Sequence, residues 1–333
     1  MKRFLTALTG IILLIVLAAT AQADSFGMGG NQFTLDFVPI SGSSNPTEAQ
    51  ANDTNRGLYG LGIVEYDYRM GVYEITNSQW DKFTVSLGVP VMGDPSSAYD
   101  QSFYDFGTGT TDVPTNCVTW YEVAQFVNWL NTSTNHQAAY KFTGTQGQSD
   151  YTFATSDAAD AWGGTNLYRH KDAYYFLPTE DEWFKAAYWN GSEIQDYATK
   201  AGDTLHQGDG TSGTGWNYKD GDDGGPAGPA YGPWDVGSGS EELNGTYDIM
   251  GNNWELMESP WDDPNYATDS IRGSRGGHWS LSSGLLAASA RYNDLPWVEG
   301  PSIGFRVASV PEPGTITLLL CGLASLLCWR RRN

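Results

Sequence analysis

Three stretches of the chain share one helix-start pattern, a threonine followed three residues later by Gln or Glu. The pattern begins at Thr76, Thr119 and Thr179. In this capping box the threonine hydroxyl and the Gln or Glu side chain each accept a hydrogen bond from the other residue's backbone N–H. Aromatic and aliphatic residues recur at helical spacing after each start, and Gly191 is placed to end the third helix. The sequence therefore predicts three amphipathic helices whose aromatic stripes face the core.

The remaining sequence favours short strands and loops. The chain has 40 glycines, and residues 200–243 are rich in Gly, Asp, Ser and Pro. Strands are predicted at 33–38, on either side of Gly71 within 64–75, and at 254–257, 276–279, 288–292 and 304–308. No linker interrupts the core pattern, so we expect one α+β domain over residues 24–309, with three main helices, short strands and long loops.

The N-terminus has the three parts of a secretory signal peptide. Positive residues at Lys2 and Arg3 precede an apolar run through Ala19 and an Ala-Gln-Ala site that ends at Ala23. We expect residues 1–23 to be removed by signal peptidase, which leaves Asp24 first. An uncleaved anchor helix is the alternative.

The C-terminus combines Pro311-Glu-Pro313, an apolar run over 315–329 and three arginines. A run of about 15 residues is shorter than the roughly 20 that span a bilayer, and the arginines would stay on the cytoplasmic side. The combination resembles the PEP-CTERM sorting tail of Gram-negative bacteria. The resemblance implies that 310–333 is a sorting signal handled by an exosortase-type protease. It also implies an exported protein, secreted or displayed at the cell surface and transiently anchored by this segment.

Charge and cysteine content narrow the possible chemistry. The net charge of −21 excludes a nucleic-acid partner, because such a surface repels phosphates. The same acidity suits calcium, or a solvated acidic surface. Cys321 and Cys328 lie in the apolar tail, so the domain holds only Cys117 and no internal disulfide. The apolar residues around Cys117 favour a buried, inert thiol.

Six ordered blocks of sequence resemble the formylglycine-generating enzyme (sulfatase-modifying factor) family. Among them are Leu177-Pro-Thr-Glu-Asp-Glu-Trp183, Tyr247-Asp-Ile-Met-Gly-Asn-Asn-Trp-Glu255 and Arg275-Gly-Gly-His-Trp279. The six blocks are residues 68–76, 113–120, 176–183, 247–255, 275–279 and 303–307. The resemblance covers nearly the whole domain and implies a variant of the C-type-lectin-like fold.

The chain departs from that family where the chemistry occurs. The enzymes use two cysteines that bind copper and activate oxygen, and by position these fall near Leu281 and Leu286. No cysteine lies between Cys117 and Cys321. Leucine neither binds metal nor carries electrons, so we expect no copper, no catalytic residue and a pseudoenzyme. An unrecognised enzymatic site is the alternative, with His278 nearest the ancestral pocket.

The resemblance also implies calcium as a cofactor. It assigns the carboxylates of Asp248 and Glu255 and the backbone carbonyls of Gly251 and Asn253 to one site, and Asn217 and Tyr218 to part of a second. Oxygen ligands from a tight turn are what calcium requires. The alternative is that Asp248 and Glu255 only cap turns.

The residues expected to line the ancestral cleft are polar and aromatic, which suits contacts with a polysaccharide or a protein ligand. They are His278, Trp279, Arg291, Tyr292 and Trp297. The first hypothesis is a non-catalytic binding or scaffold module at the cell surface. The second is an enzyme that uses an unrecognised site, and the third is a structural protein of the exopolysaccharide matrix.

Overall fold

The computed structural model of the chain describes residues 22–91, 112–219, 232–262 and 264–311. Most of the predicted signal peptide and the apolar C-terminal run lie outside these residues, together with Cys321 and Cys328. Within the described residues, no helix combines the length and the apolar character that crossing a membrane demands.

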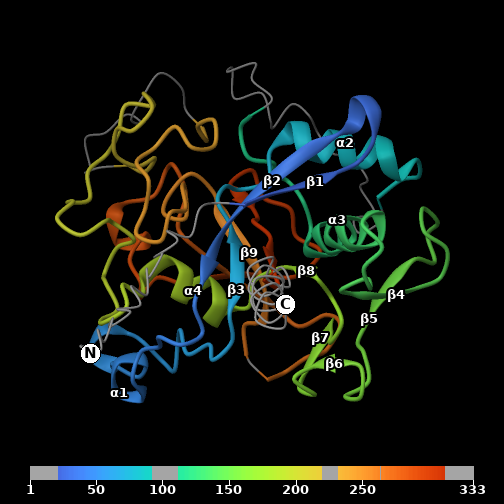
Figure 1. Cartoon of the computed structure of the whole chain (residues 1–333), viewed down its shortest axis with the longest axis horizontal. Coiled ribbons are helices and arrows are strands. Elements are labelled where there is room, and N and C mark those ends of the chain that lie inside the picture. Colours follow the sequence, from blue (N-terminus) through green and yellow to red (C-terminus); the bar gives the residue numbers. More distant parts are fainter. Residues whose placement is uncertain (1–21, 92–111, 220–231, 263, 312–333) are drawn as a thin grey trace, which may run out of the picture.

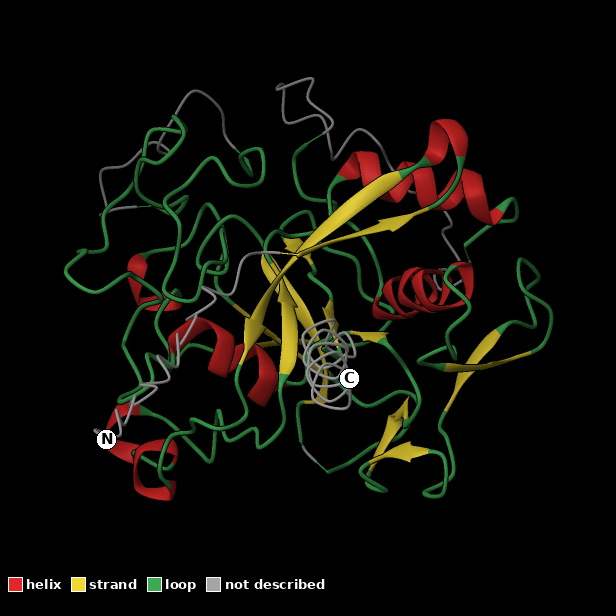
Figure 2. Cartoon of the chain, viewed as in Figure 1, coloured by secondary structure: helices red, strands yellow, loops and turns green. Residues whose placement is uncertain are grey.

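A five-stranded antiparallel sheet runs through the middle of the molecule (Figures 1 and 2). Its strands, in spatial order, are β1 (Gln22–Phe26), β2 (Phe33–Ile40), β3 (Tyr68–Gly71), β13 (Ala308–Ser309) and β8 (Tyr175–Phe176). The sheet thus joins the first and the last strands of the described chain, because β13 lies between β3 and β8.

The side chains of β2 alternate between two hydrophobic cores. Phe33, Leu35 and Phe37 belong to one core, whereas Val38 and Ile40 belong to the other. Such alternation places the two cores on opposite faces of the sheet. Helices α2 (Asn77–Leu87) and α3 (Trp120–Ser133) supply aromatic residues to the first core, and α4 (Glu180–Tyr188) supplies them to the second. In Figure 1, α4 accordingly lies on the other side of β3 from α2 and α3.

The three predicted helices are confirmed, each with its capping box. Thr76, Thr119 and Thr179 are the N-caps, and in each box both reciprocal hydrogen bonds are present. The short helix α1 (Glu48–Ala51) begins with a fourth capping box, at Thr47, that the sequence analysis missed. Helix α4 ends at Tyr188, ahead of the predicted Gly191, because Trp189 turns to extended backbone and bridges to Ile194.

A second sheet holds the later part of the chain. Its strands, in order, are β11 (Tyr292–Asp294), β10 (Arg272–Arg275), β9 (Trp254–Pro260) and β12 (Ile303–Gly304). Two hairpins complete the strands, β4 (Lys141–Thr143) with β5 (Thr152–Ala154) and β6 (Ala161–Trp162) with β7 (Asn166–His170). The predicted strand at 276–279 is wrong: the strand ends at Arg275, because Gly276 and Gly277 have φ of 99° and 77°. Within 64–75 only β3 forms.

One buried side chain, Arg69, connects the two ends of the described chain. Its Nη2 lies 2.6 Å from the Asp24 carboxylate, and its Nε donates to Ser309 Oγ at 2.9 Å and to the Val310 carbonyl at 3.3 Å. The hydroxyl of Tyr175 also donates to Asp24, at 2.9 Å. The residue predicted to begin the mature chain is therefore fixed to the strand that precedes the sorting tail.

Candidate functional site

An exposed aromatic surface forms where β9, β10 and β11 meet. The ring of Tyr292 stacks on that of Trp254, with centroids 5.4 Å apart and planes 17° apart. Trp254 is buried and Tyr292 is 42% exposed, so Trp254 supports a ring that faces solvent. The ring of His278 lies 6.5 Å from Trp254, and that of Trp279 lies 5.8 Å from His278. We call Trp254, His278, Trp279 and Tyr292 the aromatic site.

Two glycines set the position of His278. Gly276 and Gly277 have positive φ, and the Gly276 carbonyl accepts a hydrogen bond from Gly251 N at 2.8 Å. A side chain at Gly277 would lie 2.8 Å from Leu286 Cδ1, so the tight turn requires glycine there. Burial lowers the pKa of His278 to about 4. At neutral pH the imidazole is therefore uncharged and can both donate and accept a hydrogen bond.

The structure brings together only part of the predicted cleft. Arg291 lies apart from the aromatic site: it binds Glu180 through Nε and Nη2, both at 2.5 Å, and its guanidinium lies 3.9 Å from the Trp261 ring centroid. It lines a separate cavity of about 430 Å³, to which no residue of the aromatic site contributes. Trp297 follows β11 and is 43% exposed.

Leucines occupy the two positions where the family's cysteines would fall. Leu286 is completely buried in the second core, and its carbonyl accepts a hydrogen bond from the Tyr188 hydroxyl at 2.9 Å. Leu281 is half-buried and packs against the first core. Both side chains therefore serve packing. Cys117, the cysteine of the domain, is buried as expected.

The carboxylates predicted to bind calcium have different partners. Both oxygens of Glu255 bind Arg306, at 2.6 and 2.5 Å, and one also accepts from Trp183 Nε1 at 2.6 Å. Glu255 as arranged does not fit a calcium ligand, because a cation there would displace a buried arginine. Asp248 is buried with φ of 57°, and only its Oδ2 is used by a described donor, Gly237 N at 2.6 Å. Burial raises the pKa of Asp248 to about 6.

The two predicted calcium segments are neighbours. The Asn217 carbonyl accepts from Asn252 N at 2.9 Å, and a Cβ at Gly251 would lie 2.2 Å from that carbonyl oxygen. Among the described residues, neither polar atom of the buried Asn253 side chain has a hydrogen-bond partner, a deficit that an ion or water would satisfy. The Tyr218 carbonyl instead accepts from Gln207 Nε2 at 2.5 Å. Asp248, Gly251, Asn253 and Asn217 thus remain compatible with an oxygen-bound cation.

Sequence reasoning missed a group of buried acids near Arg306. Burial raises the pKa of Glu242 to about 8 and that of Glu74 well above its ordinary range. Glu74 accepts hydrogen bonds from Asn252 Nδ2 at 2.6 Å and Asn253 N at 3.2 Å. Only the position of Glu74 inside the first family block hinted at it, and nothing in the sequence marked Glu242. Within the described ranges, no group of three or more His, Cys, Asp or Glu side chains is arranged to hold a metal.

Comparisons with solved structures relate the fold to two proteins. Treponema denticola variable protein 1 is 20% identical with a TM-score of 0.56, and the match covers 88% of this chain and 100% of that one. CarF is 17% identical with a TM-score of 0.56, over 84% of this chain and 99% of that one. Both show shared mixed helix-and-sheet architecture. A comparison with curated proteins gave no match.

Two family models match the sequence and together span residues 53–332. The PEP-CTERM protein-sorting motif matches residues 309–332, which indicates export, sorting to the cell surface and processing by exosortase-type machinery. The model of the sulfatase-modifying factor enzyme 1-like domain matches residues 53–310. By this match and the fold, the chain belongs to the family of sulfatase-modifying factor enzyme 1-like domains.

Proposed function

We propose that this exported protein is a non-catalytic binding module that presents the aromatic site to a ligand at the cell surface. The observation that carries the proposal is the burial of Leu286 in the core, where the family's enzymes would hold a thiol. A position that packs the core cannot supply a copper ligand without a rebuilt neighbourhood. The fold is kept while the redox pair is replaced.

The exposed ring of Tyr292 supports a binding role. A flat aromatic face held rigid by a buried partner binds the apolar face of a sugar ring or an aromatic side chain at low entropic cost. The neutral imidazole of His278 adds a hydrogen-bonding group 6.5 Å from the Trp254 ring. The proposed ligand is a polysaccharide or a protein segment.

Calcium is proposed as a structural cofactor bound by fewer groups than the family resemblance implies. Asp248, the carbonyls of Gly251 and Asn253, and Asn217 would hold it, while Glu255 stays paired with Arg306. A hard cation among oxygen ligands would offset the negative charge of the buried acids and would supply no redox chemistry. The C-type-lectin-like description of the fold stays a prediction.

The binding proposal is tested with the purified exported protein and its Tyr292→Ala variant. A panel of glycans and peptides is titrated while tryptophan fluorescence is followed. We expect at least one ligand whose affinity falls about tenfold or more in the variant, the loss of one stacked contact. The matched control is Tyr59→Ala, because Tyr59 is an exposed tyrosine (72%) in a loop that contributes nothing to the aromatic site. Equal losses in both variants would contradict the proposed site.

The same preparation tests the enzymatic alternative. Oxygen consumption is recorded with copper and a cysteine-containing peptide as substrate. We expect no turnover above that of the heat-denatured protein. Turnover that depends on His278, shown by loss in His278→Gln, would overturn the non-catalytic proposal.

A further inference from the structure

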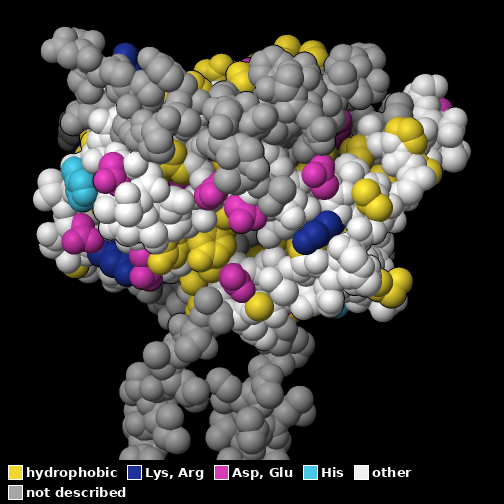
Figure 3. All heavy atoms as spheres, turned by 90° about the horizontal axis from the view of Figure 1, so that it is seen from above, with side chains coloured by type: hydrophobic (Ala, Val, Ile, Leu, Met, Phe, Trp, Pro, Cys, Tyr) yellow, Lys and Arg dark blue, Asp and Glu magenta, His cyan; other side chains and the backbone are white. Residues whose placement is uncertain are grey.

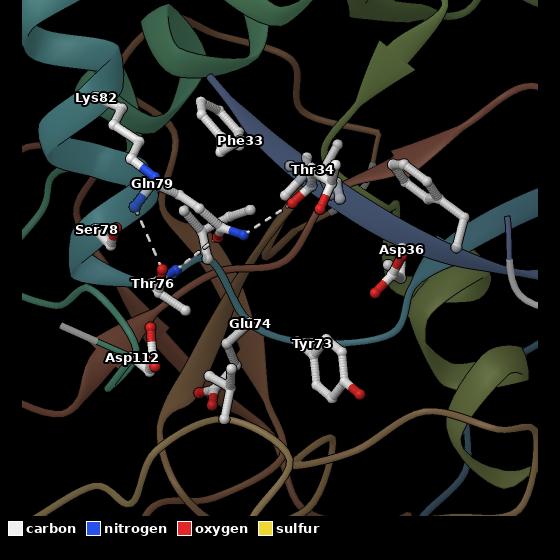
Figure 4. Close-up of a pocket in the computed structure, with 16 residues that line it drawn as sticks. Phe33, Thr34, Asp36, Tyr73, Glu74, Thr76, Ser78, Gln79, Lys82 and Asp112 are labelled. Atoms are coloured by element: carbon white, nitrogen blue, oxygen red, sulfur yellow. Dashed lines mark hydrogen bonds between the residues drawn. The ribbon is translucent and has the colours of Figure 1, made fainter. Parts of the chain in front are cut away.

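Two adjoining cavities lie beside β2, away from the aromatic site. One has a volume of about 350 Å³ and lies between β2, the segment after β3 and the start of α2 (Figure 4). The other, of about 550 Å³, lies beside residues 241–247. Asp36 and Tyr73 line both. The two cavities therefore adjoin at these residues, and we call the pair the β2 groove.

The larger cavity contains a pair of tyrosine rings. The rings of Tyr73 and Tyr247 have centroids 5.4 Å apart and planes 33° apart, and both side chains are half-buried. The backbone holds Tyr247 in place, because its N–H donates to the Val72 carbonyl at 2.9 Å. A tilted pair of aromatic faces attracts a cation, since each ring face carries partial negative charge.

The charges around these rings are acidic. After burial and Tyr247 itself, the groups that raise the pKa of Tyr73 are Asp36, Asp248 and Glu241. Glu241 is paired with Lys200 at 2.7 Å, whereas no described residue donates a hydrogen bond to the Asp36 carboxylate.

The basic side chain that lines the smaller cavity lies away from this acidic end. In Figure 4, Asp36 and Tyr73 are on one side of the cavity, and Lys82 with Gln79 is on the opposite side. On the face shown in Figure 3, acidic side chains, interspersed with basic ones, lie around a patch of apolar ones. The potential at the Tyr73 end of the groove is therefore negative, and the net charge of −21 reinforces it.

We propose that the β2 groove binds an amine-bearing chain, with an ammonium group against the accessible faces of the Tyr73–Tyr247 pair and paired with Asp36. The proposed class of ligand is therefore any linear chain that carries primary ammonium groups. The smaller cavity takes the continuation of the chain, where the lining residues Thr34 and Ser78 carry hydroxyl groups that can hydrogen-bond to it. This goes beyond the proposed function, because the groove shares no residue with the aromatic site.

The test uses isothermal titration calorimetry of the exported protein with three probes. Glucosamine trimer and N-acetylglucosamine trimer share a backbone and differ in charge, and spermidine is a cation without sugar rings. We expect the glucosamine trimer to bind, with an affinity that falls about tenfold or more as salt rises and screens exposed charges. If spermidine also binds, the groove recognises the ammonium group alone, as proposed. Equal binding of the acetylated trimer would overturn the proposal, since it carries no charge.

Variants locate the site. Asp36→Asn keeps side-chain volume and should weaken glucosamine-trimer binding by about tenfold, as should Tyr247→Leu. The control is Glu65→Gln, which removes one exposed carboxylate near the far end of the same sheet. Melting temperatures within a few degrees of wild type show that each variant folds. Equal weakening in Glu65→Gln would show diffuse charge attraction and contradict a built site, as would unchanged binding in Asp36→Asn.

Discussion

Replacing Arg306 with methionine removes the only charged partner that the structure gives to the buried Glu255 carboxylate. Both side chains are completely buried, and two hydrogen bonds join them. The guanidinium also donates to the carbonyl oxygens of Gly71, at 3.0 Å, and of Tyr247, at 2.9 Å. Methionine keeps the length and packing of the side chain but removes these hydrogen bonds, so that Glu255 keeps the one from Trp183 Nε1 without a charged partner.

The magnitude follows from what the orphaned carboxylate can do. Leaving a charge buried without its partner costs about 3–5 kcal/mol. We therefore expect Arg306→Met to lower the free energy of unfolding by about 3–5 kcal/mol at pH 7.

Urea unfolding at pH 7, followed by tryptophan fluorescence, measures this loss of stability. The control is Arg56→Met, whose ion pair with Asp196 has side chains 33% and 74% exposed. Such a surface pair is worth less than about 1 kcal/mol. A loss in Arg306→Met no larger than in the control would refute the reasoning.

Three further predictions concern the core, titration and calcium. Leu286→Ala should lower the free energy of unfolding by about 2–5 kcal/mol, and Leu281→Ala should lower it by less because Leu281 is half-buried. Urea unfolding measures both losses, and an equal loss in Leu281→Ala would contradict the packing role of Leu286. Because burial raises the pKa of Glu242 to about 8, above its ordinary value, the folded state binds more protons, and stability is lost as pH rises. Between pH 6.5 and 8 we expect wild type to lose about 1 kcal/mol per pH unit more than Glu242→Gln, and parallel pH profiles from chemical denaturation would count against it. Added calcium should raise the melting temperature of wild type but not that of Asp248→Asn, and scanning calorimetry that shows the same rise in both would remove Asp248 from the site.

Local sequence rules predicted the helices, but they failed where a contact with a residue far away in the sequence sets the role of a side chain. The threonine capping boxes are local, so the sequence placed all three main helices correctly. Glu255 looked like a calcium ligand from its block, but Arg306, 51 residues later, takes both its oxygens. Arg291 and Tyr292 are adjacent in sequence, yet neighbouring residues of an extended chain point to opposite faces, so only Tyr292 reached the aromatic site. Neither the partner of a charged side chain nor the side of the strand toward which a residue points can be read from composition or spacing alone.

The Arg69 connection gives the fold a path for mechanical load. A pull on the chain beyond Val310 reaches β13, which pairs with β3 and β8 by only two residues on each side. Arg69 holds Ser309 and Val310 and passes the tension to Asp24, in β1 at the edge of the sheet. Force applied at one terminus is thus shared by the strand at the other. A molecule tethered by its C-terminal tail would resist peeling until the Arg69–Asp24 ion pair gave way.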